Sequence, residues 1–194
     1  MSKKNITKIG AALDYSVKED CNRDITISFS GGIDSTLIAF LAKKYTNIEL
    51  IAVGVKGSHD LEAAKSAAKL INLDLTIKEI NKSDIISEAS ILQKKLKLTQ
   101  FEVGFMLPFW IAAKNAKHST LMCGQGADEV FGGYARFREA KNYPDLDKET
   151  NNLLEIIPKR ENEIAKMFGL ELSCPYLSKE VIETSKLYTE EQHI

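Results

Sequence analysis

The sequence predicts an α/β fold in which helices cover both faces of a parallel sheet. Short apolar runs alternate with longer segments of helical periodicity through the first two thirds of the chain, and this alternation is typical of parallel sheets. The run over Ile48–Val55 is almost continuously apolar, as expected for a strand that is buried on both faces. Glycine-containing turns follow this run and the run over Ile25–Phe29, so each strand can turn tightly toward a helix.

The composition is that of an ordinary globular protein. Of the 194 residues, 44% are hydrophobic and 27% are charged, and the formal net charge is −1. We therefore expect one domain over residues 1–194 and no nucleic-acid surface. Cys21, Cys123 and Cys174 are far apart in the sequence, which favours free thiols in a reducing compartment. Since no signal peptide and no apolar run of membrane-spanning length is found, the cytoplasm is the expected location.

The first half of the chain contains two predicted strands and three predicted helices. Ile6–Cys21 carries apolar residues three or four positions apart, which predicts a helix with one buried face. Ile25–Phe29 alternates bulky, strand-prone side chains, and the segment after its glycine turn keeps helical spacing through Tyr45. Ile48–Val55 is the second predicted strand. The alanine-rich stretch through Leu61–Ile71 follows it and predicts the third helix.

The pattern continues with two further strands. Leu75–Ile80 is predicted as the third strand, and Asp84–Leu96 follows as a helix. Leu107–Ala116 is predicted to be helical, with Pro108 in its first turn, where proline is tolerated. Ser119–Cys123 is the fourth predicted strand.

Two further stretches are interpreted by their periodicity. Glu149–Phe168 is charged and predicted to be helical, with a break at Pro158. We interpret it as part of a helical C-terminal extension of the same domain. Phe105, Phe109 and Trp110 lie at near-helical spacing, which favours packing in the core over a base-stacking surface.

The run Ser30–Thr36 (SGGIDST) lies between a predicted strand and a predicted helix. The amino end of a helix offers unpaired N–H groups and a positive dipole, which attract phosphate. Gly31 and Gly32 allow a close approach of the backbone. Asp34 would repel a phosphate unless a cation lay between them, which indicates Mg²⁺. The alternative, from these residues alone, is an ordinary strand–helix turn in which Asp34 and Ser35 cap the helix.

This run resembles the SGGxDS loop of the ATP pyrophosphatases, also called the PP-loop. It differs from a Walker A loop, since no Gly-Lys-Ser/Thr sequence is present. The family splits ATP into AMP and pyrophosphate, and it includes asparagine, NAD, GMP and argininosuccinate synthetases and some tRNA-modifying enzymes. The resemblance implies an adenine nucleotide alpha hydrolase-like fold and ATP as a substrate.

A second run narrows the resemblance. Cys123–Tyr134 reads CGQGADEVFGGY and resembles the GxGxDExFGGY segment of the asparagine synthetase domain. From the residues alone, its acids could also form an ordinary helix amino terminus. Arg160, Asn162 and the run Gly169–Leu177 resemble that family's R-x-N and G-[LV]-E-x-x-x-P-[FY]-L segments. The resemblance therefore extends from about residue 13 to about residue 183.

The resemblance implies a role for each matching position. The pyrophosphate-binding loop would comprise Ser30, Gly31, Gly32, Asp34, Ser35 and Thr36. The adenine pocket would be lined by Ser28, Val53, Cys123 and Gly124. Magnesium would be held by Asp34 and Asp128. The candidates on the substrate side are Gln125, Asp128, Glu129, Glu102 and Arg160. The implied reaction is attack of a carboxylate on the α-phosphorus of ATP, after which an amine displaces AMP.

Several positions depart from the family's pattern. The family often has Glu where Gln125 stands and Lys where Glu163 stands. Full-length asparagine synthetases begin with a glutaminase domain, whereas Ser2 follows Met1 here. Free ammonia, another amine or a separate glutaminase chain is therefore the expected nitrogen source. The family's essential lysine loop would lie beyond the last matching segment, and the sequence reaches Ile194 without a motif that identifies it.

The leading hypothesis is an AMP-forming synthetase that adenylates a carboxylate, with aspartate as the first candidate, and transfers the acyl group to ammonia or another amine. The alternative is a nucleotide-binding partner or regulatory protein that keeps the ATP loop without full catalysis. A third activity, tRNA thiolation, is disfavoured by the near-neutral charge and the lack of paired cysteines. Candidate partners are a separate glutaminase chain and a second copy of this chain, with no membrane and no nucleic acid among them.

Overall fold

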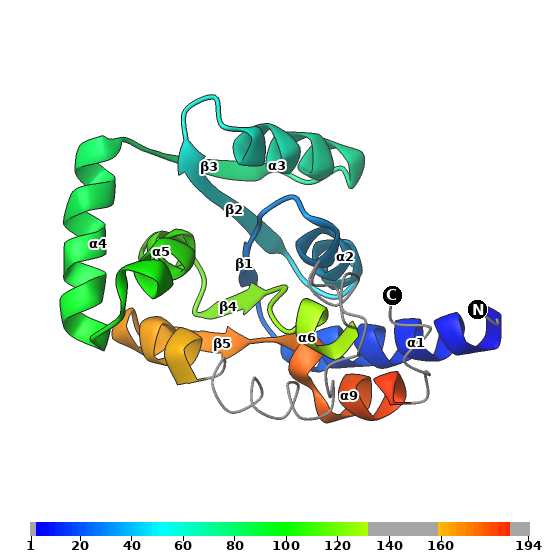
Figure 1. Ribbon diagram of the computed structural model, residues 1–194. Coiled ribbons are helices and arrows are strands. Elements are labelled where there is room, and N and C mark those ends of the chain that lie inside the picture. Colours follow the sequence, from blue (N-terminus) through cyan, green and yellow to red (C-terminus); the bar gives the residue numbers. More distant parts are fainter. Residues whose placement is uncertain (1–2, 132–158, 187–194) are drawn as a thin grey trace, which may run out of the picture.

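A five-stranded parallel sheet forms the centre of the molecule (Figure 1). The computed structural model describes residues 3–131 and 159–186. The strand order is β3-β2-β1-β4-β5, and every neighbouring pair is parallel. The strands are β1 (Ile25–Ser28), β2 (Ile48–Val55), β3 (Leu75–Ile80), β4 (Thr120–Cys123) and β5 (Glu171–Ser173). All carboxyl ends of the strands therefore meet at one edge of the sheet.

Helices cover both faces of this sheet (Figure 1). One face carries α1 (Lys3–Asp20), α2 (Ile33–Ala42), α3 (His59–Leu70) and α9 (Lys179–Ser185). The other face carries α4 (Lys82–Leu96), α5 (Gln100–Lys114) and a helix over residues 159–167. Two short elements, α6 (Ala127–Phe131) and the 3-10 helix η1 (Pro175–Leu177), follow β4 and β5. No helix in the described part of the chain is long and apolar enough to cross a membrane.

The alternation of side chains along the strands divides the core into two clusters. Ile25 and Ile27 of β1 pack with residues of α1, α2 and α3 in the first cluster, together with Met122 of β4. Leu121, the preceding residue of β4, packs in the second cluster with residues of α4 and α5, among them Trp110. The sheet is thus apolar on both faces, as its almost continuous hydrophobic runs predict.

A buried carboxylate ties together the amino ends of the strands, opposite to the edge where their carboxyl ends meet. Glu49 accepts hydrogen bonds from the hydroxyls of Thr26 and Thr76, each at 3.1 Å, and pairs with Lys117 Nζ at 2.9 Å. Burial alone would raise the pKa of Glu49, but the hydrogen bonds from Lys117, Thr26 and Thr76 hold it below its usual value. This network holds β1, β2 and β3 in register without taking part in the cavity described below.

The predicted α/β class and the parallel sheet with helices on both faces are confirmed. β2 and β3 have the predicted bounds. The C-terminal extension, however, is not only helical, since it contributes β5, which pairs with β4. Of the predicted helix over residues 149–168, residues 159–167 are helical, and residues 149–158 lie outside the described ranges.

The predicted position of Pro108 in a first helical turn was wrong. α5 begins at Gln100, so that Pro108 lies inside the helix. The physical reason is a capping box at its start, in which the Thr99 side chain accepts from the backbone of Glu102, and the Glu102 carboxylate accepts from the backbone of Thr99. This pair starts the helix earlier than the apolar periodicity alone indicated.

Candidate functional site

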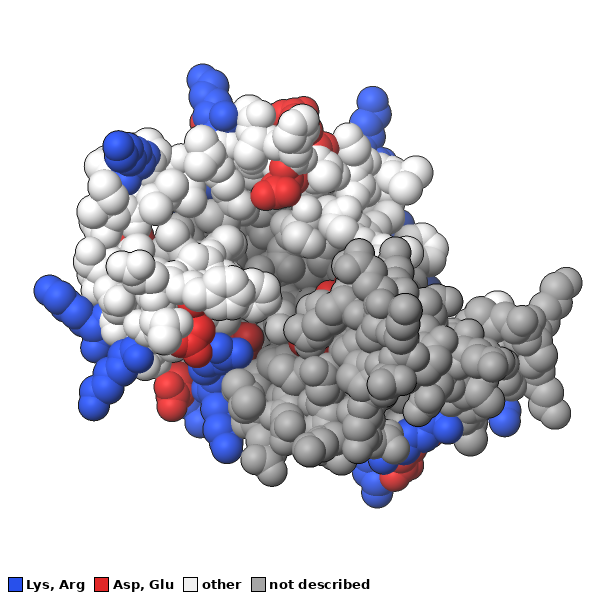
Figure 2. Space-filling view, in the orientation of Figure 1, with Lys and Arg blue, Asp and Glu red and all other residues white. Residues whose placement is uncertain are grey.

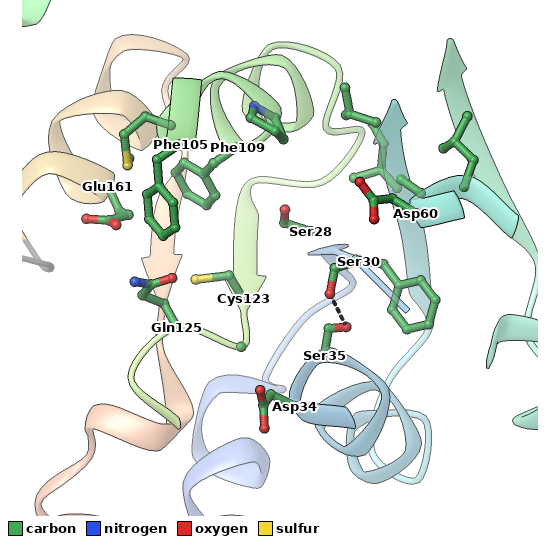
Figure 3. Close-up of a pocket in the computed structure, with 18 of the residues that line it drawn as sticks. Ser28, Ser30, Asp34, Ser35, Asp60, Phe105, Phe109, Cys123, Gln125 and Glu161 are labelled. Atoms are coloured by element: carbon green, nitrogen blue, oxygen red, sulfur yellow. Dashed lines mark hydrogen bonds between the residues drawn. The ribbon is translucent and has the colours of Figure 1, made fainter. Parts of the chain in front are cut away.

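A cavity of about 420 Å³ opens at the carboxyl ends of β1, β2 and β4 (Figure 3). β1 lies between β2 and β4 in the sheet, and the chain leaves it toward β2, whereas β4 is added later from the other side. Ligands of open parallel sheets bind at such a reversal of strand order. The cavity is therefore where the fold alone would place a ligand.

The loop after β1 is shaped by its glycines and serines. Gly31 has a φ of +77°, and a Cβ there would lie 2.5 Å from backbone atoms of Ala64 in α3, so the loop is pressed against that helix. The Ser30 and Ser35 hydroxyls lie 3.1 Å apart, and the Gly32 amide donates to Ser30 Oγ at 3.2 Å. These contacts fold the loop back over the first turn of α2.

The amino end of α2 lacks a side-chain cap. Its N-cap residue is Gly32, which makes no side-chain hydrogen bond. By contrast, α3, α4, α5 and α9 begin with capping side chains, which are Ser58, Asn81, Thr99 and Ser178. An uncapped helix start leaves backbone N–H groups available for an anion. The arrangement suits a phosphate group at the amino end of this helix.

The loop after β4 lies against the same helix start. A Cβ on Gly124 would lie 3.0 Å from the Ser35 amide nitrogen and 3.2 Å from Asp34 Cβ, so only a glycine permits this approach without a shift. Gly126 has a φ of +97° and lies against Leu177 of η1. The two glycine-rich runs, distant in sequence, thus form one wall of the cavity.

Acidic side chains dominate the charge of the lining. Asp34, Asp60, Asp128 and Glu161 line the cavity, and the described lining residues include no Lys or Arg. Burial raises the pKa of Asp34, and the nearby charges of Asp128 and Glu129 raise it further. On the face shown in Figure 2, most of the visible Lys and Arg side chains project from the outer edge. A triphosphate would therefore need a cation to approach this lining.

The acids fit a magnesium ion that is shared with a ligand. The described residues contain no group of three or more metal-binding side chains, so they form no all-protein cage. Mg²⁺ is commonly held by one or two carboxylates together with substrate phosphates and water. Asp34 lies in the first turn of α2 and Asp128 in the first turn of α6, and two such carboxylates are the donor set that this mode of binding requires.

The predicted adenine-binding residues all line the cavity, and these are Ser28, Val53, Cys123 and Gly124. Ser30, Asp34, Ser35, Gln125 and Asp128 line it as well. Gly31, Gly32 and Thr36 belong to the loop and the first turn of α2 without being part of the lining. The Thr36 hydroxyl is buried and has no hydrogen-bond partner.

Three predicted substrate-side residues lie elsewhere. Glu129 is buried in α6 and is not among the lining residues. Glu102 and Arg160 pair with each other at 3.1 Å, between the start of α5 and the helix over residues 159–167. Their ion pair connects two helices on one face of the sheet, and neither residue lines the cavity.

Sequence reasoning missed Glu161, which lines the cavity and is only 2% exposed. Its signal was helical spacing: Ile164 and Ala165, three and four residues later, are both fully buried, so the three residues share one face. Trp110 is buried in the core as predicted. Phe109 packs partly buried against the second core cluster, as predicted, and also lines the cavity. The prediction was wrong for Phe105, which is 59% exposed and lines the cavity from α5.

Known proteins with similar sequences are asparagine synthetases. A protein of Methanocaldococcus jannaschii, provisionally assigned as a glutamine-hydrolysing asparagine synthetase, is 35% identical over 170 residues, which cover 82% of this chain and 31% of that protein. Asparagine synthetase B of Escherichia coli K12 is 27% identical over 215 residues, covering 94% of this chain and 38% of that protein. The chain thus spans about a third of the length of these relatives.

Two solved structures are distantly similar. A predicted tRNA methyltransferase subunit of M. jannaschii has a TM-score of 0.44 and 18% identity, covering 85% of this chain and 73% of its own. An NH3-dependent NAD synthetase of Campylobacter jejuni has a TM-score of 0.43 and 16% identity, and the match covers 99% of this chain and 95% of that one. At the level of sequence, the family model for asparagine synthase matches residues 8–155. This match takes in both glycine-rich loops and the strands β1 to β4 that carry them, and the chain is therefore a member of the asparagine synthase family.

Proposed function

We propose that this chain catalyses the ATP-dependent, AMP-forming activation of a carboxylate, with aspartate as the first candidate, and transfers the acyl group to ammonia or another amine. The main support is the uncapped start of α2 beside Asp34 and Asp128. This combination of free N–H groups and two carboxylates suits a pyrophosphate group that carries Mg²⁺. Membership of the asparagine synthase family supports the same reaction class.

The proposed reaction has two steps. A carboxylate oxygen attacks the α-phosphorus, and the bond from that phosphorus to pyrophosphate breaks, which yields an acyl adenylate. The amine nitrogen then attacks the acyl carbon, a C–N bond forms, the C–O bond to AMP breaks, and the nitrogen releases a proton. Neither step requires a covalent bond to the protein, so positioning and charge stabilisation would account for catalysis.

Each part of the site has a proposed task in these steps. The amides at the start of α2 and the hydroxyls of Ser30 and Ser35 would hold the departing pyrophosphate. Asp34 and Asp128 would hold magnesium, which when bound neutralises charge on the phosphates. The adenine would lie among Ser28, Val53, Cys123 and Gly124, the residues at the ends of β1, β2 and β4.

We also propose a setting for this activity. The relatives' names describe glutamine-hydrolysing enzymes, so a separate glutaminase chain is a candidate ammonia donor, and free ammonia is the alternative. A homodimer and a cytoplasmic location belong to the same proposal.

Exchange of labelled pyrophosphate into ATP, with magnesium and with or without aspartate, tests the first step. We expect exchange that requires aspartate and that Asp34→Ala abolishes. Asp74→Ala is the matched control, because Asp74 is an exposed acid outside the cavity, and it should exchange like the wild type. Exchange that survives in Asp34→Ala would contradict the assigned role of this carboxylate.

One observation favours the alternative of a non-catalytic nucleotide-binding module. The described lining residues contain no Lys or Arg, although a positive side chain commonly stabilises charge in phosphoryl transfer. ATP binding by calorimetry, together with no exchange for any carboxylate tested, would support this alternative over the synthetase.

A further inference from the structure

Glu161 is a buried carboxylate that has no role in the proposed reaction as described above. It belongs to the helix over residues 159–167 and lines the cavity. Its Oε2 atom is buried without a hydrogen-bond partner. The adjacent Arg160 is directed elsewhere, since its guanidinium donates to Glu102 at 3.1 Å. A buried acceptor without a donor is unfavourable, so the site suits a ligand that brings a donor.

The charges around Glu161 favour a donor that is positive. Burial raises the pKa of Glu161 to about 7, with Arg160 acting to lower it and Glu129 to raise it. Three other acids, Asp34, Asp60 and Asp128, line the same cavity. A cationic donor would satisfy Oε2 and also offset the repulsion among these carboxylates.

The neighbouring side chains fit an ammonium group better than a metal ion. Figure 3 shows Glu161, Phe105 and Gln125 on one side of the cavity and Asp60 on the other. Gln125 can offer an amide oxygen, and Phe105 and Phe109 can offer aromatic faces to a cation. Mg²⁺ instead keeps a shell of oxygen ligands, largely water where few carboxylates hold it, and two phenyl rings beside Glu161 offer no oxygen to that shell.

We propose that Glu161 binds the ammonium group of a substrate and thereby determines which substrates the site accepts. The proposal rests on the synthetase function above and deepens it. The ammonium group can come from two sources that share this chemistry. It is either the α-amino group of an amino acid whose carboxylate is adenylated, or the amine that attacks the adenylate.

The test measures binding without turnover, using the full chain. Calorimetric titrations are run with magnesium and α,β-methylene-ATP, in which the bond to be broken is replaced. The probes are aspartate, succinate and methylammonium, because succinate has the two carboxylates of aspartate without its ammonium. Glu161→Gln keeps the shape of the side chain and removes its charge. Glu163→Gln is the control, since Glu163 is exposed on the same helix.

We expect Glu161→Gln to weaken binding of aspartate or methylammonium by about tenfold or more, while Glu163→Gln binds as the wild type does. Succinate should bind equally to both variants. A loss of affinity for aspartate assigns the ammonium group to the adenylated substrate. A loss of affinity for methylammonium assigns it to the attacking amine.

Equal affinities in wild type and Glu161→Gln for both cationic probes would overturn the proposal, as would a wild-type protein that binds neither. If Glu161→Gln does not fold, the wild type alone decides: a preference for aspartate over succinate, or binding of methylammonium, is required. Pyrophosphate exchange is measured in parallel. Selective ammonium binding without exchange would contradict the synthetase function and leave the role of Glu161 standing.

Discussion

Gly31 allows the loop after β1 to lie directly against the neighbouring helix α3. Its φ is +77°, and a Cβ there would lie 2.5 Å from backbone atoms of Ala64. Gly57 has almost the same backbone conformation, with a φ of +73°, but a Cβ there would meet nothing within 4 Å. The two residues therefore separate the effect of backbone strain from the effect of a steric clash.

Gly31→Ala is expected to destabilise the protein more than Gly57→Ala does. Both variants incur backbone strain of about 1–2 kcal/mol, and only Gly31→Ala adds overpacking of about 1–3 kcal/mol. Urea denaturation measures both losses, and ATP titration should show weaker binding only for Gly31→Ala, because only its loop must move. Equal free energies of unfolding for the two variants would show that the close approach to α3 is not a constraint.

Glu161 gives the protein a specific dependence of stability on pH. Burial raises its pKa from 4.5 to about 7, so the folded state binds this proton more tightly than the unfolded state. The proton on Glu161 therefore stabilises the folded state fully below about pH 4.5, and this stabilisation is lost as the pH rises through about 7. As the pH rises from about 5 to about 8, the free energy of unfolding of Glu161→Gln should increase by up to about 3 kcal/mol relative to that of the wild type.

Urea denaturation at several pH values measures this difference, without ligand and with Glu163→Gln as the control. The charged groups that act on Glu161 are Arg160 and Glu129, and both are retained in the two variants. A constant difference between wild type and Glu161→Gln across the pH range would show that the carboxylate is not desolvated in the folded protein.

The predicted site residues that the structure brings to the cavity and its loops are those whose positions depend on local backbone. Gly31 and Asp34 are recognisable because a strand, a glycine turn and a helix start follow one another in the sequence. For Glu161 the sequence offers only its helical spacing with Ile164 and Ala165, which indicates a buried face of the helix but does not identify the cavity that this residue lines. Phe105 was likewise placed by the way α5 lies on the sheet, and 59% of its surface remains exposed.

At the scale of elements, the start of α5 connects two helices on one face of the sheet. Glu102 Oε2 accepts hydrogen bonds from the Thr99 amide at 2.9 Å and from the Thr99 hydroxyl at 2.7 Å. Its Oε1 accepts from Arg160 at 3.1 Å. α4 has a similar capping box formed by Asn81 and Asp84. Asp84 therefore provides a match for the capping role of Glu102, without Arg160.

Glu102→Ala is expected to lower the melting temperature by more than Asp84→Ala does. Asp84→Ala should cost about 1 kcal/mol because it removes the hydrogen bond from the Asn81 amide in the capping box, whereas Glu102→Ala also leaves Arg160 without its carboxylate partner. Because neither residue lines the cavity, pyrophosphate exchange should persist in both variants. Loss of exchange in Glu102→Ala at an unchanged melting temperature would instead support the role on the substrate side that the sequence suggested.

The elements differ in how far the sequence determines them. β2 could be predicted to the residue because its eight residues form an almost continuous apolar run. β5 has only three residues, Glu171–Ser173, and exists as a strand because it pairs with β4. Such a short edge strand is specified by its partner rather than by its own periodicity. The early start of α5 was missed because capping, and not apolar spacing, determines it.

At the scale of the whole molecule, the fold brings acidic side chains and helix N–H groups together at the carboxyl ends of the strands. β1 and β4, adjacent in the sheet, each lead through a loop into a helix whose first turn carries an aspartate, Asp34 in α2 and Asp128 in α6. The described lining has four carboxylates, contributed by Asp34, Asp60, Asp128 and Glu161, and no Lys or Arg. A bare polyphosphate would be repelled by these carboxylates, while Mg²⁺ on the phosphates would lower this repulsion and would itself be attracted to the carboxylates.

Magnesium and ATP together should therefore stabilise the protein, while ATP with a chelator should not. At a ligand concentration of about 100 times Kd, binding adds about 2.7 kcal/mol, which corresponds to a rise in melting temperature of about 5–10 °C for a domain of this size. The measurement is a thermal melt with ATP and magnesium, with ATP and EDTA, and with magnesium alone. Asp34→Ala should lose most of the rise, and Asp74→Ala should keep it. An equal rise with EDTA would mean that ATP binds without a metal, and the two aspartates would then need another explanation than a shared cation.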